Sequence, residues 1–164
     1  MTDGKSIDRI GRAAIYILFG VYVIAALYLL FFMRISMWDN LTYREYFRYN
    51  TNFVPFRTIA EFAGYYRRDD SVYGDISLVN IWGNLAVFLP AGIFFPAIWK
   101  KQRRFRNFAI TAAAVIIAVE LLQFLTMRGS CDIDDFILNF CGAVIGFSLT
   151  GLKIVRRLAF AGTE

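Results

Sequence analysis

The stretch AAIYILFGVYVIAALYLLFFM, residues 13–33, runs for 21 positions without a charged side chain. At a rise of 1.5 Å per residue, a helix of this length covers about 30 Å, which is the thickness of the hydrocarbon core of a bilayer. The stretch is longer than the apolar region of a secretory signal peptide, and no small-x-small cleavage site follows it. Residues 13–33 are therefore interpreted as a membrane-spanning helix.

Three further apolar stretches suit membrane spans, at about residues 78–99, 107–127 and 136–152. The first contains Pro90 and Pro96, which membrane helices tolerate when neighbours satisfy the freed carbonyls. The chain is 58% hydrophobic, with 17 Phe and 9 Tyr, more than one small aqueous core can hide. The sequence predicts an all-α integral membrane protein, a bundle of four transmembrane helices forming a single domain over residues 1–164.

The basic residues indicate the orientation of the spans. They gather before the first span, between the second and third, and after the fourth, and an even number of spans places these clusters on one side: Lys5, Arg9, Arg12; Lys100, Lys101, Arg103, Arg104, Arg106; Lys153, Arg156, Arg157. By the positive-inside rule this side is the cytoplasm, so both termini are predicted to be cytoplasmic. The net charge of +5 follows from this arrangement, and no nucleic-acid partner is expected.

The long outer loop, residues 34–76, is rich in aromatic residues and poor in the residues typical of flexible tethers. In Tyr43-Arg44-Glu45-Tyr46-Phe47-Arg48 the aromatics at i, i+3 and i+4 share one helix face. This pattern favours an interfacial or re-entrant helix lying on the membrane, with a second helix over Pro55–Phe62.

Polar side chains occur at comparable depth in three of the spans. Glu120 lies in mid-span with Gln123 on the same face, Asn84 follows Asn80 by one turn, and Asn139 lies four residues after Asp135. A central acid in a membrane helix costs about 2.5–3.5 kcal/mol and usually faces a bundle interior or water. The shared depth predicts one outer-leaflet pocket lined by these residues.

The start of the fourth span adds three acids to this cluster. Asp132, Asp135 and Asn139 have i, i+3, i+7 spacing and are expected on one face, whereas Asp134 points elsewhere. Gly142 and Gly146 continue that face inward and favour close helix packing, with Gly83 also expected in the bundle interior.

Composition restricts the chemistry that this cluster can perform. The chain has no His and only two Cys, which excludes a His-based triad, and a disulfide between Cys131 and Cys141 is not expected because one lies in a loop and the other within a span. Two interpretations stay open: the amides and acids are interhelical hydrogen-bonding groups and a helix start, or they bind a ligand. The candidate ligand-binding set is Asn52, Asn80, Asn84, Glu120, Gln123, Arg128, Asp132, Asp134, Asp135 and Asn139.

Several of these segments carry a family resemblance. Asn52-Phe53-Val54-Pro55-Phe56 and the run from Asn80 to Gly92 resemble the N-x-x-P-F and N-x-x-x-F-x-P-x-G segments of the VanZ-like family. The later E-x-x-Q at Glu120, the R at Arg128, the D-x-D-D at Asp132 and the N-x-x-G at Asn139 follow in the family order. Cys131 stands where an aromatic residue is expected. The resemblance implies a small multi-span protein of the bacterial cell membrane, in a family whose namesake confers low-level resistance to the glycopeptide teicoplanin without remodelling peptidoglycan termini.

Two functions follow as expectations. The first is a non-enzymatic membrane protein that lowers susceptibility to teicoplanin-type lipoglycopeptides by binding the drug's lipid part or an envelope lipid in the outer-leaflet pocket. The alternative is a membrane enzyme acting on a lipid phosphate or polyprenyl-linked cell-wall precursor, with a divalent cation on Asp132 and Asp135, phosphate on Arg128, and Glu120 or Asp135 as catalytic carboxylate. A proton-coupled transporter would need a homodimer, because four spans are few for a monomer.

Overall fold

The computed structural model describes residues 3–33, 42–67, 71–153 and 155, and this part of the chain is almost entirely helical. The long helices are α1 (Asp3–Phe31), α4 (Ser71–Val87), α5 (Leu89–Ile98), α6 (Phe105–Leu125) and α7 (Ile133–Leu149). The outer segment forms α2 (Tyr43–Tyr49) and α3 (Arg57–Arg67), and a 3-10 turn, η1 (Lys100–Arg103), joins α5 to α6. Two short strands, β1 (Thr51–Asn52) and β2 (Cys131–Asp132), pair in parallel. The all-α class is confirmed.

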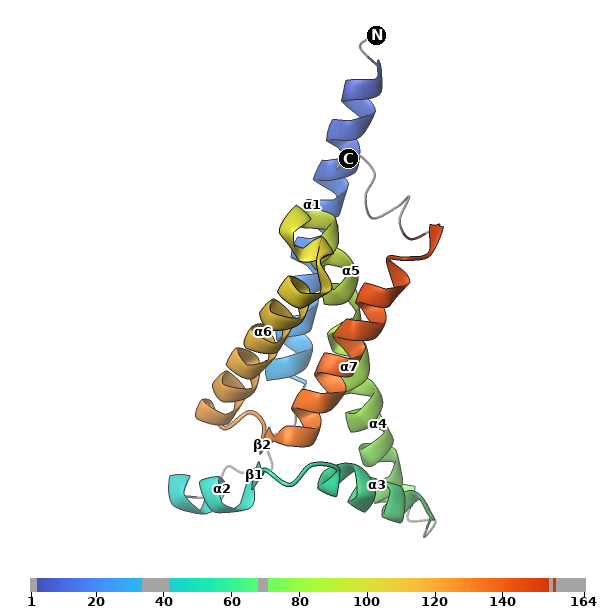
Figure 1. Ribbon diagram of the computed structural model, residues 1–164. Helices are drawn as coiled ribbons and strands as arrows, with labels where there is room; N and C mark the ends of the chain where they lie inside the picture. The colour runs from blue at the N-terminus through green and yellow to red at the C-terminus, as the bar shows by residue number, and fades with distance from the viewer. Residues whose placement is uncertain (1–2, 34–41, 68–70, 154, 156–164) are drawn as a thin grey trace.

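Three helical segments within the described residues are long and apolar enough to cross a membrane: Arg9–Phe31, Leu78–Ile98 and Phe105–Leu125. They correspond to the first three predicted spans. The fourth prediction falls on α7, whose 17 residues extend about 25 Å. α1 begins and α7 ends at the same end of the molecule, whereas α2, α3 and the strand pair lie at the opposite end (Figure 1). The total of four spans stays a prediction.

The second predicted span consists of two helices. α4 ends at Val87, and α5 begins at Leu89 with Pro90 in its first turn. Because proline has no N–H and its ring crowds the carbonyl four residues earlier, it interrupts the helix at this point. The chain resumes helical bonding at once, with Gly92 N–H donating to the Phe88 carbonyl at 3.3 Å.

Glycine permits the close contact of α7 with α4 and α5. A Cβ at Gly142 would overlap the Leu85 carbonyl, and one at Gly146 would overlap the Leu89 carbonyl. Gly92 on α5 likewise lies directly against the Ala143 carbonyl. The predicted role of Gly142 and Gly146 is therefore confirmed, whereas the expectation for Gly83 is wrong, because no atom lies within 4 Å of a Cβ placed there.

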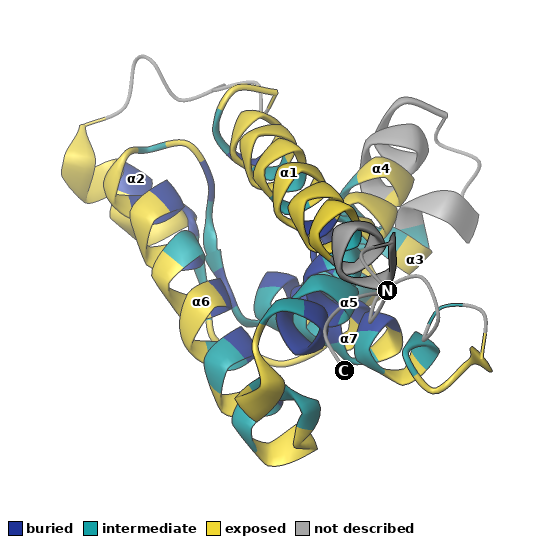
Figure 2. Cartoon of the chain, turned by 90° about the horizontal axis from the view of Figure 1, so that it is seen from above, coloured by how far each residue is buried: buried dark blue, intermediate teal, exposed yellow. Residues whose placement is uncertain are grey.

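α1 lies beside the bundle with most of its surface exposed (Figure 2). Ile17 and Ile24 are 66% and 71% exposed, which suits contact with lipid chains. Two polar contacts fix the helix: the Tyr22 hydroxyl donates to the Val87 carbonyl at 3.0 Å, and Gln123 Nε2 donates to the Leu30 carbonyl at 2.8 Å.

The outer segment docks against the end of α6. α2 begins with a capping box in which Thr42 and Glu45 bind each other's backbone N–H. The Thr42 hydroxyl, which donates to Glu45 Oε2 at 2.6 Å, and then the Thr42 N–H lower the pKa of Glu45. The Tyr46 ring is fully buried against Phe124, with ring centroids 5.5 Å apart. Part of the aromatic face that the sequence assigned to the membrane therefore packs against protein. α3 begins two residues later than predicted, and residues 34–41 and 68–70 of the outer loop lie outside the described residues.

Candidate functional site

Asp132 connects α7 to the loop before α3. It is the N-cap of α7, and its Oδ1 accepts the N–H of Asp134 at 2.8 Å. The same oxygen accepts Asn52 Nδ2 at 3.0 Å, and Oδ2 accepts the Thr58 hydroxyl at 2.6 Å. Asp132 precedes the helix and does not share the inward face of Asp135 and Asn139. The prediction that the three residues lie on one helix face is therefore wrong for Asp132. Both of its oxygens are used by the loop.

Asp134 is fully buried and caps α3, although at least 75 residues of chain separate it from the groups it binds there. Its two oxygens accept the backbone N–H groups of Phe56, at 2.5 Å, and Ile59, at 3.1 Å. A carboxylate at a helix N-terminus is favoured by the helix dipole and satisfies donors that the helix itself leaves unpaired. Phe56 has φ of 65°, a conformation that costs a non-glycine residue about 1–3 kcal/mol, and the hydrogen bond to Asp134 holds it there.

Asp135 points into the bundle, away from the loop. Its Oδ1 accepts Asn84 Nδ2 at 2.5 Å, and the two side chains are 2% and 5% exposed. Asn80, one turn earlier on α4, is half-buried. The predicted proximity of α4 and α7 polar groups is therefore present in the structure.

A second buried pair joins α7 to α6. Asn139 Nδ2 donates to Glu120 Oε1 at 2.9 Å, and Gln123, one turn further along α6, is also fully buried. The amide oxygens of Asn139 and Gln123 are buried and accept no hydrogen bond from the described residues. Leaving a buried acceptor unsatisfied costs about 1–3 kcal/mol, so a ligand or water carrying donors would be stabilised here.

Eight of the ten predicted residues, all except Asn80 and Arg128, divide into two groups with different surroundings. We call Asn52, Thr58, Asp132 and Asp134 the outer latch, because they fasten the loop to α7, and Asn84, Glu120, Gln123, Asp135 and Asn139 the inner cluster. Arg128 joins neither: its side chain is exposed, and no acid that the structure describes pairs with it. Thr58 was missed from the sequence, since a single Thr in a loop is not distinctive.

The outer latch does not fit the predicted two-aspartate cation site. Such a site needs several oxygens converging on one point, but the Asp132 oxygens bind the loop and Asp135 turns toward Asn84. Among the residues that the structure describes, no three Asp, Glu or Cys side chains gather closely enough to hold a metal ion. No chemical step is therefore assigned to a metal, and a divalent cation stays an untested prediction.

Both cysteines are free thiols. Cys131 lies in β2 beside the latch, where burial, then the negative charges of Glu120 and Asp132, raise the pKa of its thiol. Cys141 is on the exposed side of α7. Cys131 lies in the strand before α7 and Cys141 lies within α7, and no disulfide joins them, as expected.

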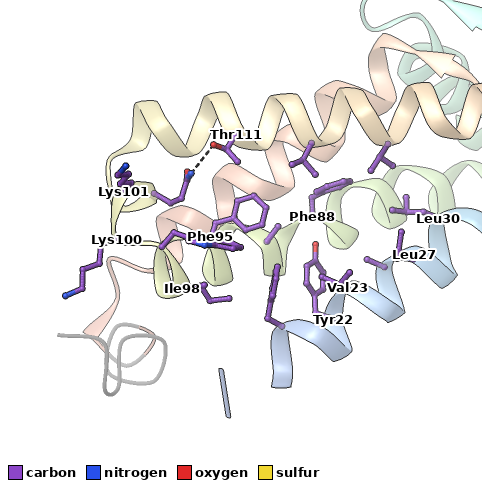
Figure 3. A pocket seen from close by; sticks show the side chains of 17 residues that line it. Tyr22, Val23, Leu27, Leu30, Phe88, Phe95, Ile98, Lys100, Lys101 and Thr111 are labelled. Atoms are coloured by element: carbon purple, nitrogen blue, oxygen red, sulfur yellow. Dashed lines mark hydrogen bonds between the residues drawn. The ribbon is translucent and has the colours of Figure 1, made fainter. Parts of the chain in front are cut away.

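A large cavity is lined by no residue of the outer latch or the inner cluster. It has a volume of about 830 Å³ and opens between α1, α5 and α6 (Figure 3). Its walls are apolar, and Lys100 and Lys101 stand at one end. No pattern in the sequence predicts this cavity, because its apolar lining residues resemble other lipid-facing residues.

The motifs and their contacts agree with one protein family. A sequence profile of the VanZ/LLP1 family matches residues 19–154, which include both the outer latch and the inner cluster. Comparison with curated proteins and with solved structures finds no match. Since the profile covers most of the chain, this protein belongs to the VanZ/LLP1 family.

Proposed function

We propose that this protein lowers susceptibility to teicoplanin-type lipoglycopeptides by engaging the drug's lipid part, or an envelope lipid, at its outer face. The observation that carries the proposal is the loop held by the outer latch. Phe53, Val54 and Phe56 are 72%, 57% and 61% exposed, although buried aspartates fix the backbone around them. A rigid loop that presents apolar side chains binds lipid at a lower entropic cost than a flexible one.

The neighbouring helix α2 enlarges this apolar surface. Tyr43, Phe47 and Tyr49 are each more than half exposed, and aromatic rings are favoured where the bilayer meets water. Together with the loop they offer an aromatic platform that suits a lipid tail lying along the membrane surface.

The proposal includes an orientation. Four spans, α7 among them, would place α2, α3 and the latch outside a bacterial cytoplasmic membrane and both termini inside. The basic turn η1 at the opposite end of the molecule supports this choice, because short basic loops stay in the cytoplasm. Arg156 and Arg157 of the last basic cluster lie outside the described residues.

The test compares two glycopeptides in a susceptible host that expresses the chain. Wild type should raise the inhibitory concentration of teicoplanin and leave that of a glycopeptide without a lipid tail unchanged. Phe53→Ser should return teicoplanin susceptibility to the level of the empty vector. The control Leu152→Ser, at a 53% exposed position three residues after the end of α7, should not. Equal teicoplanin susceptibility with and without the expressed wild-type chain would sink the proposal.

The buried carboxylate Glu120 favours a second candidate, an enzyme acting on a lipid phosphate or polyprenyl-linked precursor. A carboxylate held by Asn139 in a low-dielectric bundle is placed as a general base could be, with Arg128 exposed for a phosphate. Glu120→Gln keeps an acceptor for Asn139 but removes the base. Phosphate release from a polyprenyl diphosphate by wild type, lost in this variant, would favour the enzyme over binding alone.

A further inference from the structure

The 830 Å³ cavity is a groove with three walls. Its lining consists of the inward residues of α1, one face of α5 and one face of α6, and the named side chains of Figure 3 show α1 and α6 on opposite sides of it. The Tyr22 hydroxyl joins α1 to the Val87 carbonyl, and Gln123 of α6 joins it at the Leu30 carbonyl, which closes one end of the groove. Along the rest of the groove α1 and α6 are separated (Figure 2). The groove therefore faces the hydrocarbon between these two helices.

The length of the groove matches one leaflet. Its lining runs from Phe19 to Leu30 on α1 and from Phe88 to Trp99 on α5, each eleven residues of rise or about 16 Å. Half of the hydrocarbon core measures about 15 Å. An acyl chain of one leaflet is thus of the right extent to lie along the groove.

The groove begins at a basic end. Lys100 and Lys101 line it there, within a turn that also carries Arg103 and Arg104. Trp99, 46% exposed beside them, has the amphipathic ring typical of the membrane interface. A lipid whose chain fills the groove would therefore place its head group among ammonium groups, which favours a negatively charged one.

One more side chain at this end has unused hydrogen-bonding capacity. Gln102 Nε2 donates to the Thr111 hydroxyl at 3.0 Å, and both residues line the groove. Its Oε1 is buried and accepts no hydrogen bond from the described residues. Because protein atoms cover this oxygen, it is not a contact for a bound head group, and the Gln102–Thr111 hydrogen bond instead joins the basic turn to α6.

We propose that the groove is a binding site for an anionic glycerophospholipid. One acyl chain lies between α1 and α6 against α5, and the phosphate binds Lys100 and Lys101. The lysine end of the groove, at the connection between α5 and α6, lies at the opposite end of the molecule from the outer latch (Figure 1), and the site does not depend on the proposed action on lipoglycopeptides.

The experiment is native mass spectrometry of the full chain released from nanodiscs that contain equal parts of phosphatidylglycerol and phosphatidylethanolamine. Wild type should retain one phosphatidylglycerol per chain in preference to phosphatidylethanolamine. Lys100→Gln/Lys101→Gln should lower that preference roughly tenfold or more, because each lysine near an anionic head group contributes measurably. The matched control Arg104→Gln/Arg106→Gln removes the same charge from the same region outside the groove and should retain the preference.

A second pair of variants tests the position of the acyl chain. Val115→Trp, at a 36% exposed lining position of α6, should fill the groove and abolish retention of either lipid. Ile117→Trp, 48% exposed and outside the lining, should leave retention unchanged.

Three results would overturn the inference. Wild type could retain both lipids equally, both charge-removing doubles could lose the preference alike, or the groove could be filled by a second copy of the chain. The last case would appear as a lipid-free dimer that Val115→Trp converts to monomer.

Discussion

α1 and α7 reach their places in the bundle by opposite means. Only 11% of the most apolar segment of α1 is buried, and its exposed Ile, Leu and Val side chains suit contact with lipid. α7 is shorter and carries buried Asp134, Asp135 and Asn139, each of which makes at least one hydrogen bond to a residue outside α7. Apolar side chains, as on α1, position a helix relative to the bilayer. Polar contacts and small residues, as on α7, position it relative to other helices.

The largest effect on stability is expected when one glycine on each of these two helices is replaced by leucine. Gly146→Leu should destroy the folded state, a loss of about 3 kcal/mol or more, because the Leu89 backbone cannot move aside for a side chain. Gly20→Leu on α1 should cause no loss, since no atom lies within 4 Å of a Cβ there. The stability of both variants is measured by heating in detergent and monitoring the folded fraction by size-exclusion chromatography. Equal melting temperatures for the two variants would contradict the proposed roles.

The next test removes a contact that only α7 has. Asp134→Ala leaves the N–H groups of Phe56 and Ile59 without their acceptor and should cost about 1–3 kcal/mol of stability. Hydrogen exchange should accelerate at residues 52–59 and stay unchanged in α1. Glu61→Ala, which breaks only the exposed pair with Arg57, is the control and should change stability by about 0.5 kcal/mol or less. Unchanged exchange in the loop would mean that Asp134 does not hold it.

A smaller effect is expected where α1 does use a polar contact. Gln123→Leu removes the hydrogen bond to the Leu30 carbonyl, a net loss of about 0.5–1.5 kcal/mol, but also removes the buried amide oxygen that lacks a donor. The two effects offset each other, so the melting temperature should change little. Spin labels on Ile24 and Ile117, both exposed, should nevertheless report a broader distance distribution as α1 loosens. A distribution identical to wild type would show that lipid and Tyr22 suffice to hold α1.

The smallest effect concerns reactivity at the start of α7. Because the pKa of Cys131 is raised by burial and by the nearby carboxylates, less of its thiol is ionised at any given pH. In a Cys141→Ser background, labelling by a membrane-impermeant maleimide should reach half its maximal rate at a higher pH than labelling of a free cysteine peptide. A midpoint equal to the peptide's would mean that β2 is open to water. Labelling only after lysis would reverse the proposed orientation.

The sequence allowed much of the inner cluster to be predicted. Depth along each span follows from a constant helical rise, so the proximity of Asn84, Glu120, Asp135 and Asn139 was calculable once the spans were recognised. The same arithmetic failed for Asp132, because it sits just before the helix and its side chain follows loop geometry. Asp134 was expected to point elsewhere, but its target, the start of α3, depends on a tertiary contact that periodicity does not encode.

Two other features were beyond sequence reasoning for a physical reason. Gly83 and Gly146 are both glycines in apolar helices, and only the positions of neighbouring backbones distinguish the one in open space from the one in contact. The groove of α1, α5 and α6 is made of side chains that would be equally suitable facing lipid. The groove depends on how α1 packs against α5 and α6, and the Tyr22–Val87 and Gln123–Leu30 hydrogen bonds contribute to that packing.

The parallel pairing of β1 with β2 also affects when the loop before α3 can fold during synthesis of the chain. Asn52 and Asp132 are 80 residues apart, so the loop cannot be fastened until the start of α7 has been synthesised. At about 5–20 residues per second, translation of that distance takes roughly 4–16 s. During this interval Phe53, Val54 and Phe56 lack the aspartates that later fix them. The loop therefore takes its final shape only in the last stage of synthesis, seconds after its own residues have been added.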